Sequence, residues 1–234
     1  MNADQFVAHR GYPVRLTENT LESVKAAVDI GARYVEVDIQ LTKDQQPVLF
    51  HDRTLQRLAN DEHAVHQLEW SALQKRTLTQ SLNIPHLNEL VRYIQSTTEV
   101  LFFIEVKRNS LAEFGVSTVV DIILEVLKPV AHQCVIISYS LDALQYVRQC
   151  NDWPVGVVVD DWDDHSKQDI LHLKAEYFFC DLESLPPGKT VKLEQGKLVV
   201  FETVDAEVAN KLLQHGVDLV ETFAIGEMIK DNLV

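Results

Sequence analysis

YVEVDIQLTKDQQPVLFHD, Tyr34 to Asp52, begins as an apolar strand, turns through a short polar segment and returns as a second strand. Only about eight residues separate Tyr34–Ile39 from Val48–Phe50, whereas a crossover between parallel strands needs roughly a dozen or more. The spacing therefore predicts a β-hairpin. Within it stand two carboxylates and an imidazole, at Glu36, Asp38 and His51, where buried strands are normally apolar.

The register of this hairpin follows from its loop. With Lys43–Gln46 as a four-residue loop, Thr42 lies opposite Pro47, and counting back places Asp38 opposite His51. Directly opposed residues of paired strands carry their side chains on the same face, about 5 Å apart. We therefore expect His51 to return beside Asp38, above the rim of a sheet.

The rest of the chain alternates strand-length apolar runs with helical segments. Most of the runs are continuously apolar, as in parallel strands covered on both faces. We predict strands at Phe6–His9, Tyr34–Ile39, Val100–Val106, Cys134–Ser138, Val155–Val159, Tyr177–Cys180, Leu198–Phe201 and Asp218–Glu221. We predict helices from Glu18 to Ile30 with Thr17 as the N-cap, and at Phe114–Leu127, Ser140–Gln149 and Ala206–His215. The pattern predicts an α/β protein, a (β/α)8 TIM barrel formed by residues 1–234 as one domain, with a hairpin extension after the second strand and a short insertion before the third.

Composition narrows the possible partners. The formal charge of -14, from 21 basic and 35 acidic residues, argues against nucleic-acid binding and against stable adsorption to anionic membranes. The three cysteines are scattered and read as reduced packing residues. The first residues lack the pattern of a signal peptide, and no run of about 18 apolar residues predicts a membrane span. We therefore expect a cytoplasmic protein, of undetermined oligomeric state.

Three carboxylates close predicted strands and so belong to one rim. Glu36 and Asp38 are two residues apart and project the same way, and Glu105 and Lys107 repeat this spacing at the end of LFFIEVK. Converging carboxylates cannot all stay ionised unless a cation holds them. Oxygen ligands suit Mg²⁺ or Ca²⁺ better than Zn²⁺.

Two histidines flank this rim. His9 closes the first strand in FVAHRG and His51 closes the hairpin in LFHD. Two imidazoles beside a metal-bound phosphate can act as general base and general acid, and Arg10 and Lys107 can offset the charge of the phosphate oxygens. The combination points to metal-assisted phosphodiester cleavage.

These residues lie in motifs that closely resemble those of the glycerophosphodiester phosphodiesterases. The motifs are HRG (9–11), ENTLES (18–23), GARYVEVDIQLTKDQQPVLFHD (31–52), IPHLNEL (84–90) and IEVK (104–107), with weaker matches in SYSLDAL (138–144), ETVD (202–205) and GVDLVETF (216–223). The resemblance implies a barrel enzyme that hydrolyses glycerophosphodiesters to sn-glycerol 3-phosphate and an alcohol, with a small-molecule substrate. In related barrel phospholipases a substrate hydroxyl attacks phosphorus first, so a protein nucleophile is not required.

The resemblance also assigns roles to individual residues. It implies that His9 and His51 are the acid/base pair and that Arg10 and Lys107 bind phosphate. The metal ligands would be Glu36, Asp38 and Glu105, and supporting roles would fall to Glu18 and Asn19. We add Glu202 as a supporting residue on its own chemistry, because its carboxylate could bond the glycerol hydroxyls or add charge to the site.

The sequence departs from the family pattern at two positions near its end and in one insertion. Glu202 stands where the family often has Trp, and Phe223 follows Thr222 where the family has Asp. The segment between the second and third strands, about Leu55 to Glu99, is short. These differences bear on the head group rather than on the reaction.

Two alternatives stay open: a related diesterase for lysophospholipids or inositol phosphodiesters, and a catalytically silent barrel that binds a phosphorylated metabolite. Three other residues need placing. Glu18 and Asn19 fit the first turn of a helix, and His86 fits a loop. The acidic DDWDDH, 160–165, reads as an exposed loop at the active rim, with Trp162 as a candidate cover for the pocket.

Overall fold

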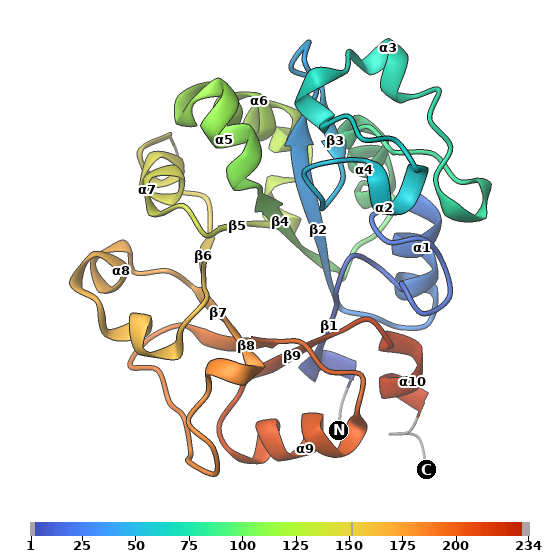
Figure 1. The fold of residues 1–234 in the computed structure, drawn as a ribbon. Helices are drawn as coiled ribbons and strands as arrows, with labels where there is room; N and C mark the ends of the chain where they lie inside the picture. The colour runs from blue at the N-terminus through green and yellow to red at the C-terminus, as the bar shows by residue number, and fades with distance from the viewer. Residues whose placement is uncertain (1–2, 151, 231–234) are drawn as a thin grey trace.

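A closed parallel barrel forms the body of the protein (Figure 1). The structure is a computed structural model that describes residues 3–150 and 152–230. Its barrel strands are β1 (Phe6–Ala8), β2 (Tyr34–Leu41), β4 (Leu101–Val106), β5 (Cys134–Ser138), β6 (Val155–Val159), β7 (Tyr177–Asp181), β8 (Lys197–Phe201) and β9 (Leu219–Thr222). Each pairs in parallel with its neighbours, and β1 closes the ring by pairing with both β2 and β9. The predicted (β/α)8 barrel is confirmed.

The hairpin is present, but its predicted register is wrong by one residue. Strand β3 (Pro47–Leu49) runs antiparallel to β2 outside the ring, and Leu41 pairs with Pro47. The loop has one residue fewer than predicted, because the Thr42 N–H already bonds the Gln46 carbonyl at 3.0 Å. Gln45 makes this tight turn with a φ of 57°.

The shift in register changes what lies opposite Asp38. The backbone N–H of Phe50 donates to the Asp38 carbonyl at 3.0 Å, so Phe50 occupies the place that was predicted for His51. His51 lies just beyond the strand, where the chain leaves the sheet.

Helices surround the barrel and cover its outer face. They are α1 (Leu21–Asp29), α4 (Leu87–Ile94), α5 (Arg108–Phe114), α6 (Val116–Leu127), α7 (Leu141–Cys150), α8 (Gln168–Leu173), α9 (Ala206–Gln214) and α10 (Ile225–Lys230). The predicted Thr17 cap is wrong, since Thr20 caps α1 by accepting from the Ser23 N–H. The predicted helix at Phe114–Leu127 is divided at Gly115, whose φ of 82° is open to glycine but strained for other residues.

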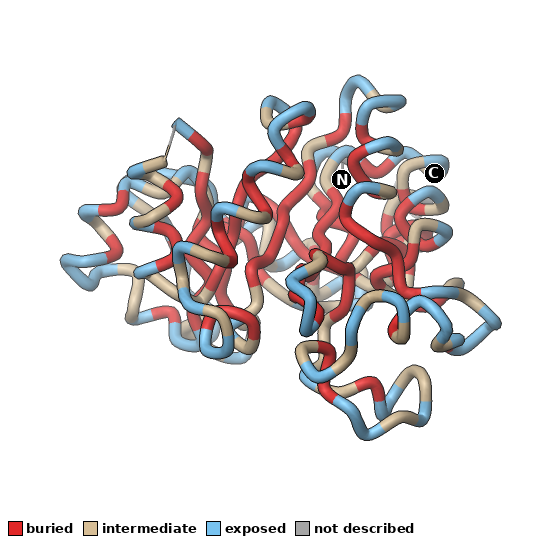
Figure 2. Tube along the Cα trace, turned by 90° about the horizontal axis from the view of Figure 1, so that it is seen from above, coloured by how far each residue is buried: buried red, intermediate tan, exposed pale blue. Residues whose placement is uncertain are grey.

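The segment between β3 and β4 forms a small lobe beside the barrel mouth. It contains α2 (Gln56–Ala59), α3 (Trp70–Leu73) and 3₁₀ turns at Val65–Gln67 and Thr79–Ser81. Its own apolar cluster comprises Val48, Phe50, Leu55, Val65, Leu73, Leu78 and Ile84. Figure 2 shows this lobe projecting from the barrel with mostly exposed loops. Because the cluster includes residues of the hairpin, the lobe holds the β2–β3 extension in place.

The strands divide their side chains between two cores. Phe102 and Ile104 point outward to the helices, while Val7, Phe103, Phe179 and others fill the barrel interior. Because side chains alternate along a strand, the inward set of β2 and β4 continues upward into Glu36, Asp38 and Glu105.

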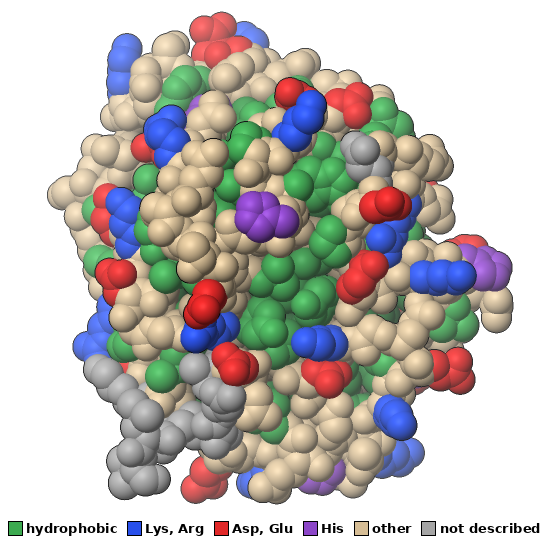
Figure 3. Space-filling view, turned by 180° about the vertical axis from the view of Figure 1, so that it is seen from behind, with side chains coloured by type: hydrophobic (Ala, Val, Ile, Leu, Met, Phe, Trp, Pro, Cys, Tyr) green, Lys and Arg blue, Asp and Glu red, His purple; other side chains and the backbone are tan. Residues whose placement is uncertain are grey.

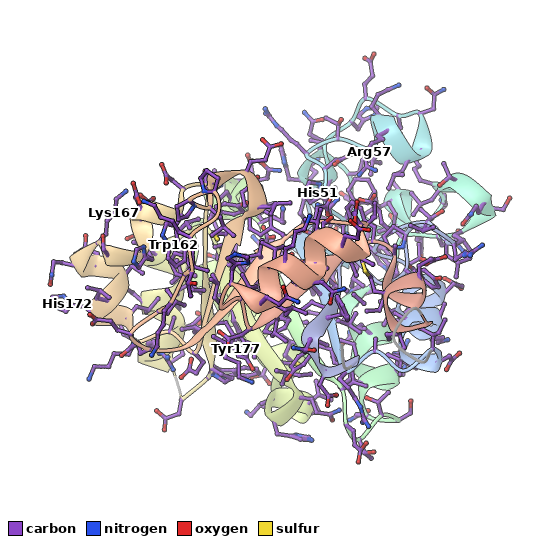
Figure 4. All side chains as sticks on the ribbon, turned by 90° about the horizontal axis from the view of Figure 1, so that it is seen from below. His51, Arg57, Trp162, Lys167, His172 and Tyr177 are labelled. Atoms are coloured by element: carbon purple, nitrogen blue, oxygen red, sulfur yellow. The ribbon has the colours of Figure 1, made fainter. Side chains whose placement is uncertain are left out.

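The two ends of the barrel differ in character. Figure 4 places Tyr177, the first residue of β7, at one end and His51 at the other. The end at which the strands begin, seen from behind in Figure 3, has hydrophobic side chains at its centre and charged groups around it. Among the described helices, none combines the length and apolar character that a bilayer crossing requires.

Candidate active site

A small cavity of about 90 Å³ opens at the end of the barrel where the strands finish. In TIM barrels this end carries the functional residues. One side of the cavity is charged and the other is apolar. Its lining comprises His9, Arg10, Glu36, His51, Glu105, Lys107, Ile137, Tyr139, Val158, Phe179, Phe201 and Glu221.

Three buried carboxylates meet at this cavity as the sequence predicts. Glu36, Asp38 and Glu105 each offer an oxygen within 4.8 Å of the others. Asp38 and Glu105 are register partners on β2 and β4. Asn19 fixes Asp38 twice, because its Nδ2 donates to Asp38 Oδ2 at 2.8 Å and its Oδ1 accepts from the Asp38 N–H at 3.0 Å. Asn19 therefore fixes the position of Asp38 within the cluster.

Two basic side chains, Lys107 and Arg10, contact the carboxylates. Lys107 Nζ lies 3.0 Å from Asp38 Oδ1 and 2.9 Å from Glu105 Oε1. Arg10 Nε lies 3.2 Å from Asp38 Oδ2, and the Arg10 backbone N–H donates to Glu36 Oε2 at 3.1 Å. Both phosphate-binding candidates thus lie beside the acidic cluster.

The pKa values of the carboxylates diverge. Burial would raise the pKa of Asp38, but Lys107 and then Arg10 outweigh it and hold that pKa well below its usual range. Burial and then Asp38 raise the pKa of Glu36 well above the ordinary value and raise that of Glu105 as well. In these surroundings Glu36 and Glu105 favour their protonated forms, and a divalent cation would favour the ionised forms.

The donor set fits a hard divalent cation. All three side chains offer oxygen, which Mg²⁺ and Ca²⁺ prefer. Glu36 Oε1 is buried without a hydrogen-bond partner, an arrangement that costs free energy unless a ligand occupies it. Lys107 forms ion pairs with Asp38 and Glu105, so its ammonium group lies beside the residues that would hold the ion.

His9 is held on three sides. Its Nδ1 lies 2.5 Å from Glu202 Oε2, and its Nε2 lies 3.7 Å from Glu36 Oε2. The Phe223 ring stacks on the imidazole at 4.7 Å with an interplanar angle of 13°. Burial lowers the pKa of His9, although the hydrogen bond to Glu202 opposes this. Both departures from the family pattern, Glu202 and Phe223, therefore contact the same imidazole.

His51, on the opposite flank of the cavity from His9, also contacts a carboxylate through Nδ1. Its Nδ1 lies 2.8 Å from Asp52 Oδ1, and Arg57 of the lobe holds Asp52 through bonds of 2.6 and 3.1 Å. Figure 4 shows His51 and Arg57 at the same end of the molecule. Burial lowers the pKa of His51, with Asp38 opposing. In both histidines a carboxylate engages Nδ1 and leaves Nε2 without that restraint.

Glu18 and Asn19 lie in the site rather than in a helix. The prediction of a first helical turn is wrong, because α1 begins at Leu21 and Asn19 has a φ of 54°. Glu18 Oε1 accepts from Arg10 at 3.0 Å and from Arg57 at 2.7 Å. Their supporting position is thus direct: Asn19 holds Asp38, and Glu18 joins Arg10 to the lobe.

Three residues that bear on the site were missed from the sequence: Asp52, Arg57 and Glu221. Glu221, on β9, lines the cavity and is buried. Burial and then Glu105 raise the pKa of Glu221 well above its ordinary value. A polar residue in the apolar run LVET was its sequence signal.

Two other candidates lie outside the cavity lining. His86 caps α4 by accepting from the Asn88 N–H at 3.0 Å. Trp162 is buried and stacks on His165 at 4.2 Å, so it does not cover the pocket.

Fold and site together define a TIM-barrel protein with a cluster of acidic, basic and imidazole groups at the carboxyl ends of its strands. The family model described as "Glycerophosphoryl diester phosphodiesterase family" matches residues 9–223. The chain belongs to this family.

Curated relatives match over shorter segments. A glycerophosphodiester phosphodiesterase of Caldanaerobacter subterraneus subsp. tengcongensis is 39% identical over 69 residues, which cover 30% of this chain and 28% of that protein. A protein of Mycobacterium tuberculosis named probable glycerophosphodiester phosphodiesterase 2 is 35% identical over 86 residues, which cover 36% of this chain and 33% of the relative. The chain thus spans a third or less of the length of these relatives.

Solved structures match along nearly the whole chain. An Oleispira antarctica phosphodiesterase in complex with the product sn-glycerol-3-phosphate superposes with a TM-score of 0.86 at 22% identity, covering 98% of this chain and 97% of that one. A putative glycerophosphoryl diester phosphodiesterase from Silicibacter pomeroyi gives a TM-score of 0.85 at 17% identity, covering 97% and 93%. At these identities the likeness shows the fold.

Proposed function

We propose that this protein hydrolyses glycerophosphodiesters to sn-glycerol 3-phosphate and an alcohol with the help of Mg²⁺ or Ca²⁺. The main observation in support is that three buried carboxylates, two basic side chains and two imidazoles converge around one cavity. Family membership supports the reaction class. A catalytically silent barrel is disfavoured because the chain has a side chain of the required kind at every predicted acid/base, phosphate-binding and metal-ligand position.

The basic residues and the metal would bind the phosphodiester. Glu36, Asp38 and Glu105 would hold the cation, which when bound supplies positive charge to the phosphate oxygens. Arg10 and Lys107 already lie within 3.2 Å of the same carboxylates. They can therefore contact the non-bridging oxygens and stabilise the charge that develops on them in the transition state.

The two histidines would move the protons. With Nδ1 donating to Glu202 or Asp52, each imidazole presents Nε2 as the atom that accepts or donates a proton. One takes the proton of the attacking glycerol 2-hydroxyl, and the other protonates the departing alcohol oxygen. Water then opens the resulting cyclic phosphate, with the proton roles reversed, to give sn-glycerol 3-phosphate. Glu202 and Asp52 support this reaction by holding the ring orientation and the tautomer.

An activity screen tests the proposal. Purified protein is offered glycerophosphocholine, glycerophosphoethanolamine, glycerophosphoglycerol and glycerophosphoinositol, each with Mg²⁺ or Ca²⁺ and after treatment with EDTA, and released sn-glycerol 3-phosphate is measured. We expect release from at least one diester, its loss after chelation, and its recovery on adding the metal back.

The result has two separate readings. Release that persists unchanged in EDTA would contradict the metal while leaving the reaction intact. Release of the alcohol phosphate instead of glycerol phosphate, or cleavage of a lysophospholipid alone, would contradict the proposed substrate class.

A further inference from the structure

Glu221 is a buried carboxyl group without a role in the reaction as proposed. It lies on β9 and is 3% exposed. Its Oε1 is buried and has no hydrogen-bond partner. Among the residues that the structure describes, Glu36 Oε1 is the other carboxylate oxygen that lacks both a hydrogen bond and an ion pair in this way. Leaving such a group unmatched is costly, so Glu221 is a candidate for ligand binding.

The metal does not account for this oxygen. The oxygens that lie within 4.8 Å of one another come from Glu36, Asp38 and Glu105, and Glu221 is outside that set. The free oxygen of Glu36 belongs to the cation-binding group, whereas Glu221 lines the same cavity from β9 and is not a member of that group.

Glu221 lies at the boundary between the charged and the apolar sides of the cavity. Glu221 follows Val220, which pairs with Val200, so Glu221 lies beside Phe201 on the neighbouring strand. Phe201, Val158 and Phe179 line the same small cavity. A ligand group placed here would meet apolar surface and one hydrogen-bonding carboxyl group. Glycerol carbons carrying a hydroxyl have both features.

We propose that Glu221 is a specificity-determining residue that hydrogen-bonds the terminal hydroxyl of the substrate's glycerol. The inference rests on the proposed function. The glycerol 2-hydroxyl stays beside the phosphorus, where it can attack. The terminal hydroxyl is the remaining polar group of the glycerol, and it loses water when the cavity encloses it. Pairing it with Glu221 satisfies both groups.

Two substrates and three variants test the assignment. Glycerophosphocholine is compared with 2-hydroxypropyl phosphocholine, which lacks the terminal hydroxyl and keeps the one that can attack. For the wild type we expect kcat/KM to favour glycerophosphocholine about five- to tenfold, the factor for one buried hydrogen bond. Glu221→Leu should abolish this preference, mainly by raising KM for glycerophosphocholine, and leave the analogue within about twofold.

The other variants separate hydrogen bonding from general damage. Glu221→Gln keeps a hydrogen-bonding side chain and should retain most of the preference. Glu202→Gln alters the carboxylate that contacts His9, and it should lower turnover of both substrates equally. Thermal unfolding of each variant confirms that it is folded.

Distinct outcomes would overturn the inference. A preference that survives in Glu221→Leu removes Glu221 from glycerol recognition. An increase in the metal concentration for half-maximal activity, with the preference unchanged, makes Glu221 a metal ligand instead. If the wild type cleaves neither diester, the proposed function fails, and that result is distinct from a failure of the Glu221 assignment alone.

Discussion

The two halves of the barrel mouth differ sharply. On β1, β2 and β4, or directly after their last residues, stand His9, Glu36, Asp38, Glu105 and Lys107. On β5 to β8, or directly after β5, the corresponding lining is Ile137, Tyr139, Val158, Phe179 and Phe201. The same strand geometry thus presents a charged wall on one side and an apolar wall on the other.

The comparison indicates that the two walls contribute differently to the site. The charged wall is built at a cost, since buried like charges oppose one another, and it depends on contacts such as Asn19 with Asp38 and Lys107 with Glu105. The apolar wall contributes no charge. It limits water near the charged wall, and electrostatic interactions are stronger where water is excluded.

The largest expected effects follow from removing the imidazoles on the charged wall. His9→Ala and His51→Ala should each lower kcat by about a hundredfold or more, because each removes a proton-transfer group. Steady-state kinetics on the diester identified by the screen measure the change.

A distant histidine provides the control for these variants. His172 is exposed on α8, away from His51 (Figure 4), and His172→Ala should keep activity within about twofold. If either His9→Ala or His51→Ala were as active as His172→Ala, that imidazole would not belong to the acid/base pair.

A smaller effect is expected from the apolar wall. Phe201→Ala should raise KM about three- to tenfold and change kcat less, since it removes apolar contact surface and no reacting group. Measuring kcat and KM separately tests the division between the walls. A loss of kcat as large as that of His9→Ala, with KM unchanged, would show that Phe201 positions the reacting groups.

The sequence was sufficient to predict the charged wall because strand periodicity is regular. Residues two apart must share a face, so Glu36 with Asp38 and Glu105 with Lys107 could be assigned to one rim. The hairpin register was less predictable. It depended on the left-handed conformation of Gln45, which shortens the loop and places Phe50 opposite Asp38.

The supporting contacts were beyond sequence reasoning for a different reason. Arg57 belongs to a lobe without regular periodicity, so its bonds to Asp52 and Glu18 follow only from the tertiary structure. Glu221 could have been found, because it interrupts an apolar strand in the same way as Glu36.

The smallest expected effect concerns stability at the boundary between the walls. The pKa of Glu221 is raised by burial and by Glu105, so the folded state holds this proton more tightly than the unfolded state does. The resulting stabilisation is present below the ordinary glutamate pKa and is lost as pH rises through the folded-state value. In EDTA, the contribution of Glu221 to the free energy of unfolding should therefore fall as pH rises above the ordinary glutamate pKa, and the difference between the pH profiles of wild type and Glu221→Leu isolates it.

Glu221→Leu should weaken this fall and make the metal-free protein about 1–3 kcal/mol more stable at the upper end of the range, since it removes a buried unmatched carboxyl group. Urea unfolding at several pH values measures both quantities. Glu221→Gln removes the titration and keeps a buried polar group, so it should flatten the pH dependence with a smaller gain at the upper end of the range than Glu221→Leu gives. Parallel pH profiles for wild type and Glu221→Leu would mean that Glu221 is already matched in the free protein. That result would leave Glu36, within the charged wall, as the unmatched carboxyl group of the mouth.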